Sequence, residues 1–143
     1  MVWINLHFIL PNKPYVKEHS MDESGMPDDI KKLIMDVKHK VQGKKVILYQ
    51  GFFASVERRL EEFCQAINQM PSDYVMIAMG KGPNNYYDVL KKKYQSDKIL
   101  FIPFIIPPFH LYVTEMASIG VMSYSPHQKT HAGVVNALYC APN

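Results

Sequence analysis

Short uninterrupted apolar runs alternate with segments of helical periodicity through the middle of this chain of 143 residues. The runs lie at residues 46–49, 74–79, 98–102 and 119–124, and a glycine or proline closely follows each of the first three. Such runs fit strands that are buried on both faces, and a helix is the usual connection between consecutive parallel strands. The sequence therefore predicts an α/β fold, a parallel sheet covered by helices on both faces.

The expected helices are placed by their apolar spacing and by the residues that begin them. The first begins at Pro27, the second near Ser55, the third after a cap at residues 84–85, and the fourth at Pro107–Pro108. A further strand is expected at Val2–Leu10. That run is too short to cross a membrane, because a spanning helix takes roughly 20 apolar residues.

Composition limits the classes of partner. The formal net charge is +3, from 16 Lys and Arg against 13 Asp and Glu, and it suits an anionic small molecule. The run Lys91–Lys93 is not interleaved with aromatic residues as a nucleic-acid groove would be, so no nucleic-acid partner is expected. Cys64 and Cys140 are too few for a disulfide framework, and they are expected to be reduced thiols of a cytosolic protein.

The carboxyl ends of the strands are the expected ligand site, because ligands of open parallel sheets bind beyond those ends. Glycine at two of these ends permits close approach of the backbone to a ligand. His110 lies early on a helix at this rim, and its alternative role is that of a partly buried histidine with satisfied hydrogen bonds. The candidate rim residues are Gly51, Phe52, Gly80, Phe104, Ile105, His110 and Tyr124.

The arginines of the chain form one adjacent pair, Arg58 and Arg59, just after the first of these strand ends. A guanidinium at the start of a helix beside the rim could grip a phosphate with two parallel hydrogen bonds. Alternatively, Arg58 pairs with Glu61 or Glu62 on a solvated helix face. The residue pattern leaves both interpretations open.

Two other sequence patterns do not predict a ligand site. Gly80–Pro83 lacks the spacing of a Walker loop and of the dinucleotide fingerprint, so we interpret it as a turn that ends a strand. His127 and His131 have a spacing that could suit a metal, but no cysteine or carboxylate lies near them. No metal site is therefore expected.

Three blocks of the sequence resemble, in order and spacing, a known protein family. They are KKVILYQGFFASVERRLEEFCQAI, YVMIAMGKGPNNYYDVLKK and KILFIPFIIPPFHLYVTEMASIGVMSYS. They look like the donor-binding domain of retaining glycosyltransferases with two Rossmann-like halves, the family 4-like enzymes of GT-B fold. ILPNKPY resembles the crossover from the acceptor half, and NALYCAPN resembles the segment before the family's Lys-x-x-Glu motif. The resemblance runs from about Phe8 to the end of the chain.

The resemblance implies a Rossmann-like fold, one half of a GT-B glycosyltransferase. Residues 1–43 would lead from the acceptor-binding half, and residues 44–143 would form the nucleotide-sugar donor domain. The implied reaction is transfer of a hexosyl group from a UDP- or GDP-sugar to a polysaccharide or lipid-linked acceptor, as in bacterial capsule or lipopolysaccharide synthesis, with no cofactor. The family's carboxylate motif would lie beyond Asn143, so we expect a fragment that does not turn over alone.

The resemblance also assigns roles to residues. Arg58 matches the catalytic basic residue that stabilises the leaving diphosphate, and Gly51 matches the glycine at the diphosphate-facing turn. Arg59 stands where the family usually has glycine, so which arginine contacts the donor is left open. The full enzyme would be cytoplasmic and work at the inner face of the membrane. The remaining donor-binding positions implied are Phe104 and Ile105, which border the base, and Tyr139, Pro142 and Asn143.

An alternative class is a free-standing flavodoxin-like module that binds a nucleotide or a protein without catalysis. A receiver-type signalling domain needs clustered acids at the strand ends, whereas the ends here carry Gln, Gly, Pro and Tyr. In an interaction domain, Phe52, Phe53 and Phe109 would form the partner surface. A response to nucleoside diphosphates would distinguish the enzyme half from an interaction domain.

Overall fold

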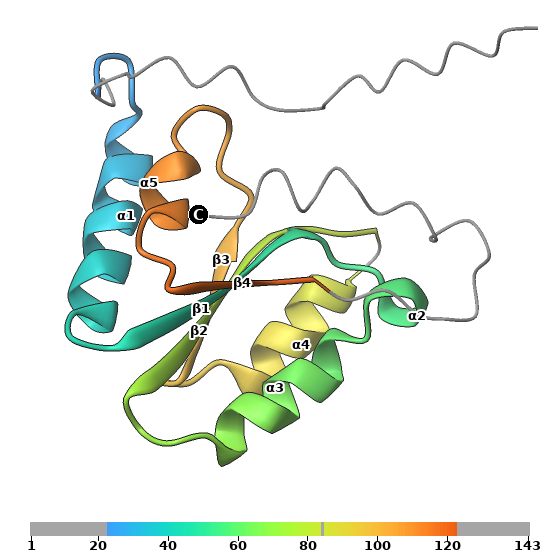
Figure 1. Ribbon diagram of the computed structural model, residues 1–143. Coiled ribbons are helices and arrows are strands. Elements are labelled where there is room, and N and C mark those ends of the chain that lie inside the picture. The colour runs from blue at the N-terminus through green and yellow to red at the C-terminus, as the bar shows by residue number, and fades with distance from the viewer. Residues whose placement is uncertain (1–22, 84, 123–143) are drawn as a thin grey trace, which may run out of the picture.

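A parallel sheet lies between two layers of helices in the computed structural model, which describes residues 23–83 and 85–122 (Figure 1). This arrangement confirms the predicted α/β class. The strands are β1 (Lys45–Phe52), β2 (Tyr74–Lys81), β3 (Ile99–Pro103) and β4 (Ile119–Val121). The helices are α1 (Asp28–Val41), α2 (Ser55–Arg58), α3 (Leu60–Gln69), α4 (Tyr86–Tyr94) and α5 (Leu111–Thr114). The expected strand at 2–10 and the segment from 123 onward lie outside the described residues.

The strand order is β3-β2-β1-β4, so the direction of winding reverses at β1. β1 and β2 run side by side from the pair Lys45 and Tyr74 to the pair Phe52 and Lys81. β4 pairs with the opposite side of β1 and forms the edge of the described sheet. In an open parallel sheet, the carboxyl ends next to such a reversal are where a crevice for ligands forms.

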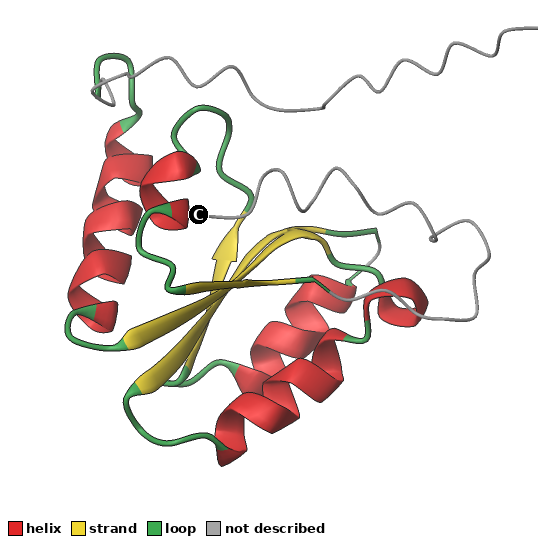
Figure 2. Cartoon of the chain, in the orientation of Figure 1, coloured by secondary structure: helices red, strands yellow, loops and turns green. Residues whose placement is uncertain are grey.

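Figure 2 shows helices on both faces of the sheet. Alternate residues of the strands pack against these two helical layers. Val46 and Leu48 of β1 face the core beneath α1 and α5. Ile47 and Tyr49 face the core beneath α3 and α4. Because side chains of a strand alternate between its two faces, a continuous apolar run is what a sheet buried on both sides requires.

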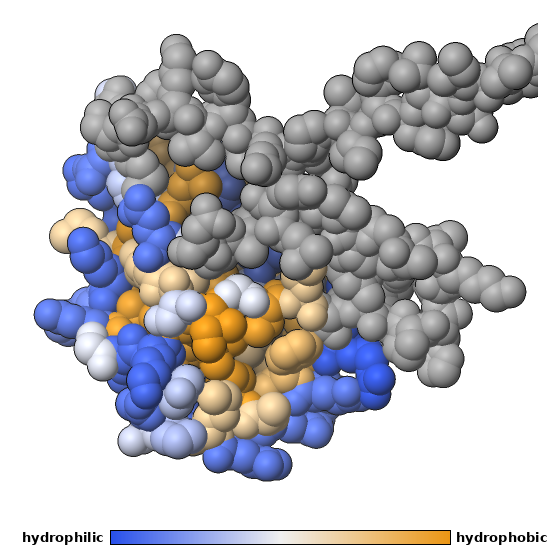
Figure 3. Space-filling model, viewed as in Figure 1, coloured by the Kyte–Doolittle hydropathy of each residue, from blue (hydrophilic) through white to orange (hydrophobic). Residues whose placement is uncertain are grey.

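The β4 edge is less well covered than the centre of the sheet. Ile119 of β4 is 49% exposed, whereas every residue of Val75–Met79 in β2 is buried. Figure 3 shows hydrophobic surface gathered over this part of the sheet, with polar residues around it. Both outer layers are therefore needed to bury the central strands, and β4 is the strand that they shield least.

The helix expected from Ser55 is in fact two helices, α2 and α3, separated by Arg59. Arg59 has φ 46° and ψ 37°, the left-handed conformation, and is the non-glycine residue with positive φ in the described part of the chain. A residue in that conformation cannot continue a right-handed helix. The left-handed conformation costs about 1–2 kcal/mol for a residue with a Cβ atom. The break redirects the chain so that Leu60 and Cys64 of α3 reach the sheet core.

The helix expected at Pro107 begins four residues later, as α5 at Leu111. Before α5, backbone hydrogen bonds run from an N–H to the carbonyl three residues earlier. They join the Phe109 N–H to the Ile106 carbonyl (3.0 Å) and the Leu111 N–H to the Pro108 carbonyl (3.0 Å). Proline has no N–H to donate, so the segment is held by tight turns before α-helical bonding starts. The result places His110 at the beginning of α5 rather than within a longer helix.

Replacement of Arg59 tests the strained position. We expect Arg59→Gly to be more stable to urea than Arg59→Ala by about 1 kcal/mol, because glycine adopts positive φ without a Cβ clash. Both variants lose the same exposed contact with Glu62, so that contact cancels in the comparison. Ala66→Gly, on the exposed face of α3, is the control and should lower stability instead. A more stable Arg59→Ala would contradict the left-handed assignment.

Candidate functional site

A cavity of about 330 Å³ opens at the carboxyl ends of β1 and β2 and against the segment between β3 and α5. This volume lies at the lower end of the range for small-molecule sites. Most of its surface is apolar, and its polar groups come from three side chains and exposed backbone. Its lining consists of Gln50, Gly51, Phe52, Met79, Gly80, Lys81, Phe104, Ile105, Pro107 and His110.

The structure brings together all of the predicted rim residues that it describes. They meet because parallel strands end on the same side of a sheet, as the sequence argument assumed. Their role in ligand binding stays a prediction. The predicted residues found in the cavity lining are Gly51, Phe52, Gly80, Phe104, Ile105 and His110. The other donor-site predictions, Tyr124, Tyr139, Pro142 and Asn143, lie outside the described residues.

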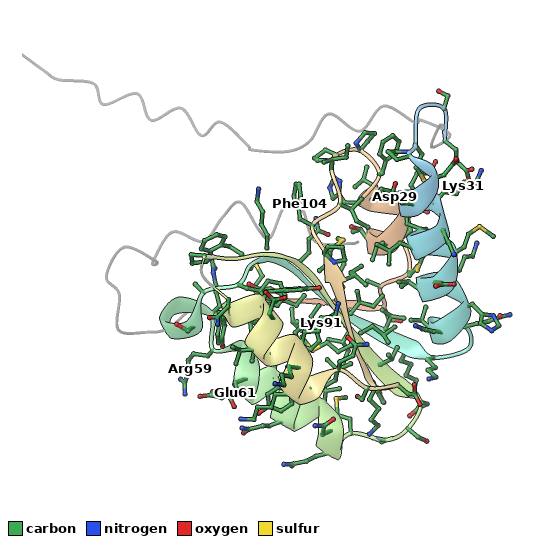
Figure 4. All side chains as sticks on the ribbon, turned by 180° about the vertical axis from the view of Figure 1, so that it is seen from behind. Asp29, Lys31, Arg59, Glu61, Lys91 and Phe104 are labelled. Carbon is green, nitrogen blue, oxygen red and sulfur yellow. The ribbon has the colours of Figure 1, made fainter. Side chains whose placement is uncertain are left out.

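Neither arginine belongs to the cavity lining. The Arg59 guanidinium contacts the Glu62 carboxylate, with Nε donating to Oε1 at 2.9 Å, and Figure 4 shows it beside α3, well away from Phe104. Arg58 is half-buried at the end of α2, where its backbone N–H donates to the Ala54 carbonyl at 3.1 Å. The expected pairing of an arginine with Glu61 or Glu62 is thus present, but it is made by Arg59.

The ends of β1 and β2 are in direct backbone contact, and glycine makes this contact possible. A Cβ atom on Gly80 would lie 1.8 Å from the Gly51 carbonyl oxygen, and one on Gly82 would lie 2.1 Å from the Phe53 carbonyl oxygen. The Phe53 N–H donates to the Lys81 carbonyl at 2.8 Å and continues the pairing past the end of β1. These glycines therefore serve close packing of two strand ends that form one wall of the cavity.

Lys81 is the charged member of the lining residues that were not predicted from the sequence, and the others are Gln50, Met79 and Pro107. Lys81 is the last residue of β2, and its Nζ lies 4.7 Å from the centroid of the Phe104 ring. Among the described residues that line the cavity there is no carboxylate, so the Lys81 ammonium is the charged group of that lining. Its position at the carboxyl end of a strand was visible in the sequence, but its aromatic neighbour comes from a distant loop.

Two further polar side chains reach the cavity. The Thr114 hydroxyl donates to the Gln50 side-chain oxygen at 2.8 Å, which fixes the orientation of the Gln50 amide. His110 Nδ1 is buried and makes no hydrogen bond with another described residue. Burial also lowers the pKa of the His110 imidazole below its ordinary value, so the ring is neutral at pH 7. A neutral imidazole can donate one hydrogen bond and accept another.

The lining combines aromatic and aliphatic walls with one ammonium, one amide and one neutral imidazole. Such a set suits a ligand with a flat or apolar part and a negative group. Within residues 23–83 and 85–122, no three His, Cys, Asp or Glu side chains come together as a metal site would require. None of the helices in those ranges is long and apolar enough to span a membrane.

Comparison with known proteins yields similarity of structure alone: no protein family and no curated protein matches the sequence. Anabaena Alr3699/HepE, solved in complex with UDP, aligns with a TM-score of 0.53 and 17% identity over 81% of this chain and 33% of that one. The Candida albicans trehalose-6-phosphate phosphatase N-terminal domain aligns with a TM-score of 0.44 and 16% identity over 66% of this chain. This chain spans a third of the first protein and 25% of the second. The HepE alignment supports the α/β fold.

Gly51 and Gly80 form a matched pair for testing the strand contact. Their φ angles are nearly equal, 156° and 155°, but a Cβ on Gly51 would have its nearest contact at 3.6 Å. We expect Gly80→Ala to lose about 1–3 kcal/mol more stability than Gly51→Ala, because only the first overpacks against backbone. Urea unfolding followed by circular dichroism measures both. Equal losses would show that φ strain, and not contact, determines the requirement for glycine.

His110 should make stability depend on pH. The pKa of His110 is lower in the folded state, so as the pH falls from 7 the unfolded chain takes up this proton before the folded chain does. The contribution of His110 to stability is therefore present above its unfolded pKa and is lost as the pH falls. We expect His110→Asn to flatten the decrease of unfolding free energy over this range, whereas His39→Asn, on exposed α1 surface, should leave it unchanged. Parallel curves for the wild type and His110→Asn would contradict this assignment.

Proposed function

We propose that this chain is the donor-binding half of a glycosyltransferase and that its cavity takes the nucleoside diphosphate of a nucleotide-sugar. The observation that carries the proposal is the charge of the cavity. An ammonium, from Lys81, lies at the carboxyl ends of parallel strands in a mainly apolar pocket, and the described residues of its lining include no carboxylate. An anion with an aromatic part is the ligand class that this combination selects.

The apolar wall formed by Phe52, Phe104 and Ile105 would accept the base and ribose. Stacking of a base on an aromatic side chain is favourable for any base, whereas hydrogen bonds distinguish one base from another. Gln50 and His110 are uncharged polar side chains of the lining that can supply such hydrogen bonds. A cavity of about 330 Å³ accommodates part of a nucleotide-sugar, so the sugar would extend beyond it toward an acceptor.

The backbone at Arg59 supports the family resemblance from an independent direction. The resembling glycosyltransferases usually have glycine at this position, and Arg59 adopts the left-handed conformation that glycine enters most readily. The local geometry therefore suits a glycine, the residue that the family pattern usually has at this position. The structural likeness to HepE also supports the proposal, because HepE was solved in complex with UDP, a nucleoside diphosphate.

Hexosyl transfer would then need parts beyond the cavity. In the proposed reaction Arg58 stabilises the leaving diphosphate, and fixed positive groups lower the barrier because charge develops on that leaving group. Arg59 stays a predicted donor contact, although it is bound to Glu62 in this state. The acceptor, a polysaccharide or lipid-linked sugar, would be held by an acceptor-binding half, and the full enzyme would act in the cytoplasm at the membrane face.

Calorimetry and thermal unfolding with UDP, GDP and their sugars test the proposal. A ligand at about 100 times its Kd should raise the unfolding free energy by about 2.7 kcal/mol. Phe104→Ala should weaken binding of the preferred nucleotide by about tenfold, since one stacking surface is lost. Val89→Ala, which alters a similarly exposed apolar residue on α4, should have no effect. A folded protein that responds to none of these nucleotides would overturn the proposal.

A further inference from the structure

Backbone contacts fix the position of Lys81 at the end of β2. It pairs in register with Phe52, and its carbonyl accepts the Phe53 N–H at 2.8 Å. The glycines on either side pack against β1 with no room for a Cβ atom. The Cα of Lys81 therefore keeps its place at the cavity, while its side chain is exposed and can change direction.

The ammonium of Lys81 differs from most of the lysines that interact in the described structure. Lys45 contacts Asp73, Lys31 contacts Glu23, and Lys93 contacts Glu61, so each of these charges has a carboxylate beside it. The contact shown for Lys81 is with the face of Phe104, 4.7 Å from the ring centroid. An aromatic face attracts a cation more weakly than a carboxylate or phosphate does. An anionic ligand could therefore draw this ammonium away.

We propose that Lys81 binds the phosphate of the ligand in this cavity and that its movement uncovers the Phe104 ring for the base. The inference deepens the proposed function and rests on it for the nature of the ligand. A nucleoside alone would have to displace the ammonium from the ring without offering it an anion. A nucleoside diphosphate offers both the phosphate for Lys81 and the base for Phe104, and so it gains from both contacts.

The arginine pair does not provide this contact in the structure. Arg59 is engaged with Glu62 outside the cavity, and Arg58 is absent from the cavity lining. Lys81 is thus the basic residue of the described cavity lining and contacts Phe104 of the base wall, and Arg58 keeps the separate role proposed above at the reacting end of the donor.

Titration calorimetry of the whole chain with UDP, uridine and inorganic pyrophosphate tests this role. Lys81→Met keeps the length of the side chain but removes its charge, and Lys81→Arg restores a charge. We expect Lys81→Met to weaken UDP and pyrophosphate binding by about tenfold, since a charge-assisted contact is lost. Uridine affinity should equal or exceed that of the wild type, since no ammonium has to be displaced from the ring. Lys81→Arg should recover most of the UDP affinity, and added salt should weaken UDP binding less in Lys81→Met than in wild type.

Lys91→Met is the matched control, because Lys91 also lies over an aromatic ring, that of Tyr87 at 5.9 Å, but outside the cavity. It should bind every probe as wild type does. The role of Lys81 is overturned if Lys81→Met binds UDP and pyrophosphate as tightly as wild type, or if it loses uridine to the same extent as UDP. The chain could instead bind pyrophosphate through Lys81 but bind neither UDP nor GDP. That result would support the anion site and refute the nucleotide-sugar proposal. A wild type that binds no phosphate-containing probe refutes both.

Discussion

The close backbone contact between the ends of β1 and β2 is the constraint on which the rest of the site depends. Gly80 and Gly82 let β2 touch the carbonyls of Gly51 and Phe53, at distances that no side chain would permit. The two strands stay paired as far as Phe52 and Lys81, so an aromatic ring and an ammonium emerge side by side at one rim. A Cβ at either glycine would push the strands apart and would separate these two groups.

The same contact couples the site to the core on one side of the sheet. Phe53, which follows β1, is fully buried and packs edge-on against Tyr49 and Tyr87. Its ring anchors the end of β1 to the layer formed by α3 and α4, and its backbone anchors the end of β2. Burial of a large aromatic ring is among the strongest single contributions to a core. The cavity wall therefore gains rigidity from a residue that does not itself line the cavity.

The sequence was sufficient for the fold and for most of the cavity wall, because both follow from local rules. Continuous apolar runs predict buried parallel strands, and the rim residues then follow from the side on which parallel strands end. The sequence did not single out Lys81, because its contact with Phe104 and the lack of a carboxylate among the described lining residues arise only in the folded chain. The break at Arg59 was equally hidden, because arginine ordinarily favours a helix. The sequence indicated this break only through the family resemblance, because the resembling proteins usually have glycine at this position.

The different contacts of Arg59 and Lys81 follow from the chemistry of their side chains. Arginine has a rigid planar fork, and Arg59 uses it to hold the Glu62 carboxylate across the strained junction between α2 and α3. Such a fixed contact suits a residue that must stabilise one backbone conformation. Lysine carries a compact charge on a flexible stem, which can rest on the Phe104 ring in one state and turn to a phosphate in another. In the role that we propose for Lys81, its ammonium covers the Phe104 ring until an anion binds and then turns to that anion.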